Sequence, residues 1–295
     1  MTSVSSTIRI VVSILVACVM AHVSEASAQE KTLLRMRLKK DMSFRYDAQT
    51  SATQQMSIMG QEISTEMVSQ IRMSMSVIDA PLGRSTIRCV FSDAKVATSA
   101  RSLEGIVPNI DTSMSMTRFD GTEAIITLDQ IGKLISIQWT KDSSVAPFVR
   151  SSQVLSRMSA SFPLQEVGVG DSWSTTTIDT ASVPLGNGGI ITDMTLKNTY
   201  RGIRDTLGFR CWYVESTATS FRQSGNISAG EIDMVIDGSG SYSVQSFVES
   251  STGMLVLTTG EVSSNSRISV SGQQSMIVPG DSHIGFSVKR RTENK

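Results

Sequence analysis

The stretch Ile203-Arg204-Asp205-Thr206-Leu207-Gly208-Phe209-Arg210-Cys211-Trp212-Tyr213 is the part of this sequence that decides the fold. It begins as an apolar strand, continues through a turn built on Asp and Gly, and ends in a second strand with Arg-Cys and two large apolar residues. A near copy lies earlier in the chain, as Ile78-Asp79-Ala80-Pro81-Leu82-Gly83 followed by Arg88-Cys89-Val90-Phe91. Two such similar hairpins indicate an internal duplication.

A common offset relates the two halves of the chain. Cys89 and Cys211 are 122 positions apart, and the segments Gly132-Lys133-Leu134 and Gly253-Met254-Leu255 are 121 positions apart. Two landmarks with nearly the same offset are expected when one structural unit has been repeated. The sequence therefore predicts two related lobes.

Strand patterns predict an all-β fold. Ile71, Met73, Met75 and Val77 alternate with polar residues, which is typical of a strand with one buried face. Only 5% of residues are aromatic and 6 are proline, which suits solvated strands and turns. We expect two duplicated lobes of curved antiparallel sheet, resembling a half-barrel or a periplasmic carrier that folds such a sheet around lipid.

Further strands are predicted at 125–128, 134–139, 232–236, 242–244, 254–257 and 285–289. The N-terminal arm, residues 33–59, is expected to be one long strand or a bent hairpin half, with a turn at Gly60 and a partner strand over 63–77. Residues 98–113 are expected to be irregular or to hold a short helical turn, and residues 184–189 a mobile turn.

One segment departs from the strand pattern. Ser144 is a helix-capping residue type, Pro147 suits a first turn, and apolar residues then recur at helical spacing until Pro163. The sequence predicts a helix over 145–160. The expected organisation is a signal peptide (1–28), an N-terminal β lobe (29–143), a linking helix (144–163) and a C-terminal β lobe (164–295).

The N-terminus has the features of an export signal. A single basic residue, Arg9, precedes an apolar run over 10–23, and Ala26-Ser27-Ala28 fits a cleavage site. The run is shorter than the ~20 residues of a membrane span. Leu15-Val16-Ala17-Cys18 offers an alternative, a lipobox in which Cys18 would be acylated and become the N-terminus. Either interpretation predicts an exported protein, periplasmic, secreted or anchored to the cell envelope.

The charge balance argues against nucleic acid as a partner. The chain has 27 basic and 27 acidic residues, and no basic stripe is evident. The cluster Lys289-Arg290-Arg291 is interpreted as a solvated tail.

Several short motifs resemble those of a family of uncharacterised exported bacterial β-rich proteins. They are Leu38-Lys39-Lys40, Met59-Gly60-Gln61, Gly132-Lys133-Leu134 and Val169-Gly170-Asp171-Ser172-Trp173. They span most of the chain that follows the signal, although this chain has Asp41 where the family usually has Gly. The family has no established activity, so the resemblance implies export and a β-architecture.

An enzyme is a distant alternative. Gly170-Asp171-Ser172 and Gly280-Asp281-Ser282 both resemble the start of a serine hydrolase motif, and His283 follows the second. Such hydrolases alternate strands and helices, and this chain does not. Both segments are better interpreted as β-turns, and no cofactor is implied.

Methionine is the residue type that suggests a ligand. Met73 and Met75, and likewise Met114 and Met116, have the Met-x-Met form known from copper(I) handling, but alternation along a strand explains that spacing without metal. His283 is the only histidine after the signal, which argues against a multi-histidine metal site. Methionine side chains are flexible and can pack against apolar ligands of variable shape.

Cys89 and Cys211 could form a disulfide in an oxidising compartment, or each could be buried separately in its own lobe. A bridge needs Cα atoms within about 7 Å, which a sequence does not reveal.

The predicted function is therefore that of an exported, non-enzymatic binding protein that shelters an apolar or lipid ligand in a concave face containing methionine. The alternative is a structural or interaction protein of the cell envelope without a ligand. The sequence leaves the oligomeric state open.

Overall fold

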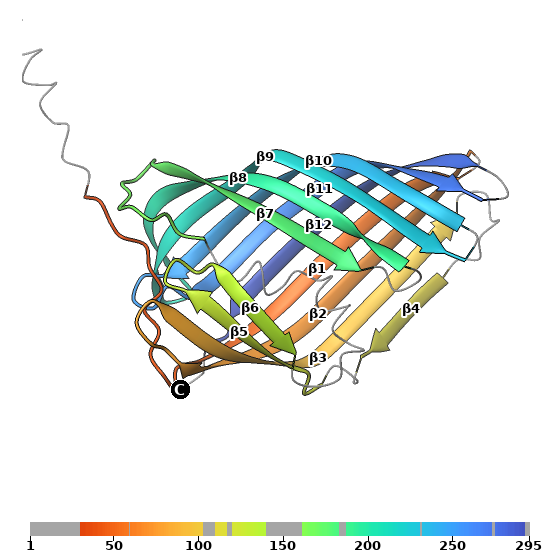
Figure 1. The fold of residues 1–295 in the computed structure, drawn as a ribbon. Coiled ribbons are helices and arrows are strands. Elements are labelled where there is room, and N and C mark those ends of the chain that lie inside the picture. Colours follow the sequence, from red (N-terminus) through yellow and green to blue (C-terminus); the bar gives the residue numbers. More distant parts are fainter. Residues whose placement is uncertain are drawn as a thin grey trace, which may run out of the picture.

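The described residues of the chain form one antiparallel sheet of twelve strands (Figure 1). The computed structural model describes residues 30–58, 60–102, 110–116, 120–139, 161–182, 187–230, 232–272 and 275–292. The strands are β1 (Ser43–Ile58), β2 (Gln61–Asp79), β3 (Arg84–Ser102), β4 (Ile110–Ser115), β5 (Glu123–Asp129), β6 (Leu134–Trp139), β7 (Ser172–Ser182), β8 (Asn187–Thr206), β9 (Phe209–Ala229), β10 (Ile232–Glu249), β11 (Leu255–Ser271) and β12 (Met276–Arg290). No helix among the described residues has the length and hydrophobicity that a membrane span requires.

The first and last strands pair with each other at the middle of the sheet. The order is β6-β5-β3-β2-β1-β12-β11-β10-β9-β8-β7, with the short β4 beside β3. Within the described residues no pairing joins β6 to β7, so the sheet is open. Figure 1 shows it curling, with β5, β6 and β7 in front of its central strands. The prediction of an all-β fold built from curved antiparallel sheet is confirmed, and the two expected lobes share one continuous sheet.

The two halves begin with the same backbone hydrogen bonds. Ahead of β1, the amide of Asp41 donates to the carbonyl of Val77 (2.9 Å). Ahead of β7, the amide of Gly170 donates to the carbonyl of Tyr200 (2.7 Å). Asp41 and Gly170 both have positive φ, 69° and 95°, and aspartate is one of the few residues that tolerate this conformation. The similarity noted in the sequence thus extends to the geometry at the start of each half.

A segment of the N-terminal arm closes one end of the curved sheet. We call residues 30–38 the N-terminal strap, and the end of the sheet that it crosses the near end. Backbone hydrogen bonds tie the strap to three places far apart in the sequence, namely Thr32 to Val167 (2.9 Å), Met36 to Gln130 (2.9 Å) and Arg37 to Thr252 (2.8 Å). The Arg35 guanidinium also donates to the carbonyl of Leu164 (2.6 Å). Gln130 follows β5 and Val167 precedes β7, so the strap connects the two arms of the open sheet.

The main hydrophobic core fills the near end, and it draws on both arms. Leu34 of the strap and Ile87 of β3 are fully buried in it, and Phe162 packs edge-on against Trp212 of β9 with ring centroids 5.7 Å apart. Tyr46 is fully buried and its hydroxyl donates to the carbonyl of Leu255 (2.9 Å). The near half of the concave face is therefore filled by the protein's own side chains.

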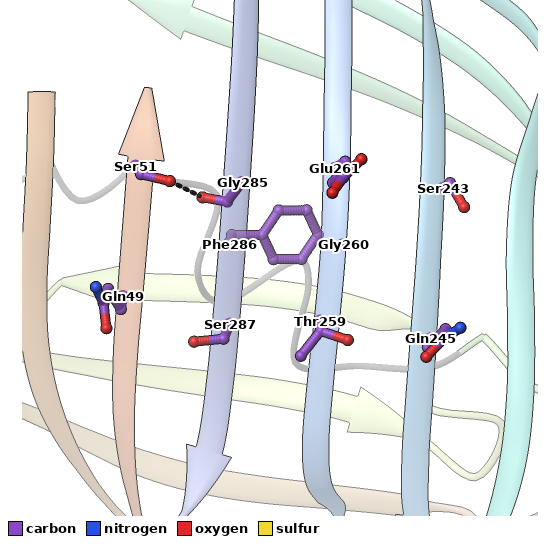
Figure 2. Close-up of a pocket in the computed structure, with 10 residues that line it drawn as sticks. All are labelled: Gln49, Ser51, Ser243, Gln245, Thr259, Gly260, Glu261, Gly285, Phe286 and Ser287. Atoms are coloured by element: carbon purple, nitrogen blue, oxygen red, sulfur yellow. Dashed lines mark hydrogen bonds between the residues drawn. The ribbon is translucent and has the colours of Figure 1, made fainter. Parts of the chain in front are cut away.

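A second, smaller core lies further along the same face, and two of its aromatic rings lie over glycines. Phe286 of β12 lies beside Gly260 of β11, as Figure 2 shows, and Phe221 of β9 lies beside Gly240 of β10. A Cβ at Gly260 would be 2.7 Å from Cζ of Phe286 and 2.5 Å from Cγ2 of Val244. The missing side chain is what lets the ring lie against the neighbouring strand.

Gly260→Ala is therefore expected to destabilise the protein by about 1–3 kcal/mol, because overpacking forces the ring and Val244 to move. Gly280→Ala is the matched control on β12, where the nearest atom would be 3.4 Å from the new Cβ. Chemical denaturation of the two variants should show a clear loss for the first and little change for the second. Equal losses would show that the aromatic contact does not determine the effect.

The basic cluster near the C-terminus was wrongly interpreted as a solvated tail. Arg290 is in β12, and it forms an ion pair with Glu249 (2.7 Å) in which the two side chains are only 14% and 17% exposed. Its guanidinium lies over the rings of Phe44 (4.6 Å) and Phe209 (4.5 Å). Arg290 therefore belongs to the near-end core, which local charge alone could not indicate.

Four other local expectations need correction. Residues 33–42 of the N-terminal arm are not a continuous strand, since β1 begins at Ser43. Residues 98–102 and 110–113, expected to be irregular, belong to β3 and β4. Gly280-Asp281-Ser282, expected to be a turn, lies within β12. Residues 187–189 of the expected mobile turn (184–189) belong to β8. The predicted helix at 145–160, the signal peptide at 1–28 with Cys18, and residues 184–186 lie outside the described residues.

Candidate functional site

The four methionines singled out in the sequence occupy different environments. Met73 and Met75 of β2 are each 1% exposed and belong to the near-end core. Met116 is also buried there, whereas Met114 on β4 is 53% exposed. Met114 pairs with Val96 and so shares its face, which is the core-bearing face of the sheet. All four methionines therefore lie on the core-bearing face, where three are buried in the near-end core and Met114 alone is exposed.

Small residues cover the middle of the concave face beyond the second core. Cross-strand pairing aligns Gly238, Ser266 and Gly280 in one row, and Gly240, Ser264 and Ser282 in the next. We call these two rows the small-residue belt. The hydroxyls of Ser264 and Ser282 hydrogen-bond to each other (2.7 Å), and that of Ser266 donates to the carbonyl of Gly280 (3.2 Å). The belt places little side-chain volume on this face.

Apolar residues return between the belt and the far end of the sheet, the end opposite the strap. Pairing aligns Ile236, Ile268 and Val278 in one row and Met234, Val270 and Met276 in the last. We call these the far-end apolar rows. Ile236 and Val278 are buried, but the other four residues are only half-buried. The alternation at 232–236 marked one strand of this surface, but the residues that β11 and β12 contribute to it were not predicted.

The opposite, outer face carries a groove with a volume of about 610 Å³ (Figure 2). Two cross-strand rows form its sides on β1, β12, β11 and β10. The first row is Gln49, Ser287, Thr259 and Gln245, and the second is Ser51, Gly285, Glu261 and Ser243. Gly285 contributes no side chain to the second row, and the hydroxyl of Ser51 lies beside it. We call this feature the outer groove; nothing in the sequence marked it, because its strands come from both ends of the chain.

A second depression of about 670 Å³ lies further along the outer face. Two pairs of its polar side chains interact with each other. Asn265 donates to the carboxylate of Asp281 (2.7 Å), and Arg222 lies 3.8 Å from the carboxylate of Asp237. These groups already have protein partners, in contrast to those of the outer groove.

Cys89 and Cys211 are free thiols and both are completely buried. They lie on β3 and β9, and the sheet order places five strands between these two. Burial raises the pKa of Cys89 to about 12 and, together with the nearby Glu249 carboxylate, raises the pKa of Cys211 to about 11. Because the thiolate is the reactive form, these values describe unreactive structural thiols.

The residues of the hydrolase alternative lie apart. Ser172 is on β7, where its hydroxyl is 3.0 Å from that of Thr199. His283 is on β12, with Nδ1 3.0 Å from the hydroxyl of Ser263. Four strands separate β7 from β12 in the sheet order, so Ser172 and His283 do not form a catalytic pair.

Potential metal ligands are equally dispersed. In the described part of the chain no three His, Cys, Asp or Glu residues are grouped as a metal site would require.

Two surfaces have a composition that suggests binding, namely the far-end apolar rows and the outer groove. No protein-family model matches the chain, and neither does any curated protein sequence.

Proposed function

We propose that this protein is an exported, non-enzymatic binding protein that holds an apolar ligand, such as a lipid acyl chain, in the far half of its concave face. One observation carries the proposal. The far-end apolar rows lie on the same face as the two cores, yet four of their six side chains remain half-buried. Apolar side chains on a core-bearing face gain stability when a partner covers them.

The neighbouring belt supports the proposal by its shape. Glycine and serine occupy two paired rows of three positions and place little side-chain volume on this face, although the Phe221 ring already lies beside Gly240. Met234 and Met276 lie in the last row, one row beyond the residues that border the belt, and flexible thioether side chains adapt to chains of different shape. Burial of apolar surface contributes about 25 cal/mol per Å², so an acyl chain offers a substantial driving force.

A second candidate is a structural or interaction protein of the cell envelope that has no ligand. The observation that favours it is the near half of the concave face, where Met73, Met75 and their neighbours form a closed core without space for a ligand. Both candidates agree that the near half of the concave face is a closed core. They differ only in whether the far half of that face binds a ligand.

Native mass spectrometry of the protein purified from its own cell envelope separates these candidates. The binding proposal predicts a lipid-sized additional mass that organic extraction removes and that added fatty acid or phospholipid restores. A protein without additional mass that takes up neither lipid would contradict the proposal and favour the structural role.

A pair of adjacent substitutions locates the ligand. Met276→Glu places a charge in the far-end apolar rows and is expected to weaken fatty-acid binding at least about tenfold, because burying a carboxylate against an acyl chain is unfavourable. Ile277→Glu is the control, since the next residue along β12 faces the other side and is 68% exposed. Fluorescent fatty-acid titrations should show a loss for the first variant alone. Equal affinity in both variants would place the ligand elsewhere.

A further inference from the structure

Most polar side chains of the outer groove have no partner in the part of the chain that the structure describes. In the described part of the chain, the side chains of six lining residues make no hydrogen bond or ion pair: Gln49, Ser243, Gln245, Thr259, Glu261 and Ser287. Ser51 donates to the carbonyl of Gly285 (3.4 Å), as Figure 2 shows. The groove thus presents amide, hydroxyl and carboxylate groups that are free to bind a ligand.

The composition of the groove excludes several ligand classes. No lysine or arginine lines it, and Glu261 is its only charged residue, so phosphates and other anions are disfavoured. Phe286 is its only large apolar side chain, and the ring is already packed in the second core. A single exposed carboxylate among hydroxyls is also a poor site for a metal cation. The amides, hydroxyls and single carboxylate of the lining suit a neutral ligand rich in hydroxyl groups.

The geometry of the two rows suits an extended ligand of this class. Neighbouring strands are about 4.8 Å apart, which is close to the length of one sugar residue, so each row repeats its hydrogen-bonding groups at that interval. The two oxygens of a carboxylate can accept hydrogen bonds from two adjacent hydroxyls of a sugar ring. A side-chain amide can donate to one such hydroxyl and accept from the next. The two glutamine amides stand at the ends of the first row, on β1 and β10.

We propose that the outer groove binds a neutral saccharide chain, which lies across β1, β12, β11 and β10 between the two rows. Glu261 accepts hydrogen bonds from sugar hydroxyls, and Gln49 and Gln245 contact the outer sugar residues. This surface is on the opposite side of the strands from the proposed apolar site. Saccharide binding is therefore independent of that site.

Calorimetric titration of the full chain with cellohexaose, maltohexaose and chitohexaose tests the proposal. We expect saturable binding of at least one of these neutral hexasaccharides. Glu261→Ala should weaken it about tenfold or more, the usual effect of losing a hydrogen bond to a charged group. The double variant Gln49→Ala, Gln245→Ala should also weaken binding.

The control is Asn265→Ala in the second depression, which should leave saccharide affinity unchanged. All of the substituted side chains are exposed, so melting temperatures should stay close to that of the original protein. Absence of binding for all three saccharides at their highest soluble concentration would overturn the proposal. Binding that survives the groove substitutions, or that Asn265→Ala weakens equally, would overturn it as well.

Discussion

Glu249→Ala is expected to lower the free energy of unfolding by about 3–5 kcal/mol. The substitution leaves the positive charge of Arg290 in the near-end core without its carboxylate, and breaking one side of a buried ion pair typically has an effect of this size. The Arg290 guanidinium cannot simply turn to solvent, because it is held between the rings of Phe44 and Phe209. Urea denaturation followed by circular dichroism measures the loss.

The matched control for this ion pair is Asp237→Ala. Asp237 lies 3.8 Å from Arg222, and both side chains are more than 70% exposed. Exposed pairs contribute about 0–1 kcal/mol, so the control should change stability little. A loss as large as that of Glu249→Ala would contradict the importance of burial at Arg290.

The same pair gives the protein a defined response to acid. Burial acts to raise the pKa of Glu249, but hydrogen bonds from Arg290, Thr252 and Ser251 outweigh it, so the pKa is lowered. A carboxyl group with a lowered pKa stabilises the fold above its unfolded pKa of about 4.3. That stabilisation disappears as the pH falls through the folded pKa. The Glu249→Ala variant should lack this part of the acid dependence.

Gly253→Ala is expected to detach the N-terminal strap. Gly253 has φ of +74°, and a Cβ there would be 2.5 Å from the carbonyl oxygen of Arg35 and 2.7 Å from the Cα of Met36. These are backbone atoms, so the strap itself would have to move. We expect a loss of several kcal/mol, composed of about 1–2 kcal/mol for the left-handed conformation and the rest for the lost strap contacts.

Gly208→Ala separates these two contributions. Gly208 occupies the equivalent kind of near-end turn with φ of +83°, but no atom would lie within 4 Å of a Cβ added there. The control should therefore show the conformational effect alone. Limited proteolysis should cleave the strap region faster in Gly253→Ala than in Gly208→Ala. Identical stability and cleavage would show that the strap does not depend on this contact.

Local patterns in the sequence correctly predicted strands and turns that depend only on neighbouring residues. The alternation from Ile71 to Val77 identified β2, and the Asp129–Gly132 turn joins β5 and β6 as expected. The strap was mistaken for a strand because its leucines and methionine resemble one. Its hydrogen bonds instead reach residues near 130, 167 and 252, and a local pattern carries no information about such distant partners.

The candidate sites were less predictable, because they depend on where each strand lies in the sheet. Met73-Ser74-Met75 and Met114-Ser115-Met116 have the same spacing, yet the first is in the interior strand β2 and the second is at the end of the short strand β4. The outer groove requires the pairing of β1 with β12. That pairing joins opposite ends of the sequence and leaves no mark on either segment.

The central position of β1 and β12 has a consequence for how the protein is made. Of the twelve strands, β1 is synthesised first and β12 last. The backbone hydrogen-bonding groups on one edge of β1 therefore have no partner strand until β12 has been synthesised. Contacts between distant segments also slow folding. During this interval β1 is open to incorrect pairing with other chains, and termination of synthesis before β12 would remove a central strand rather than a peripheral one.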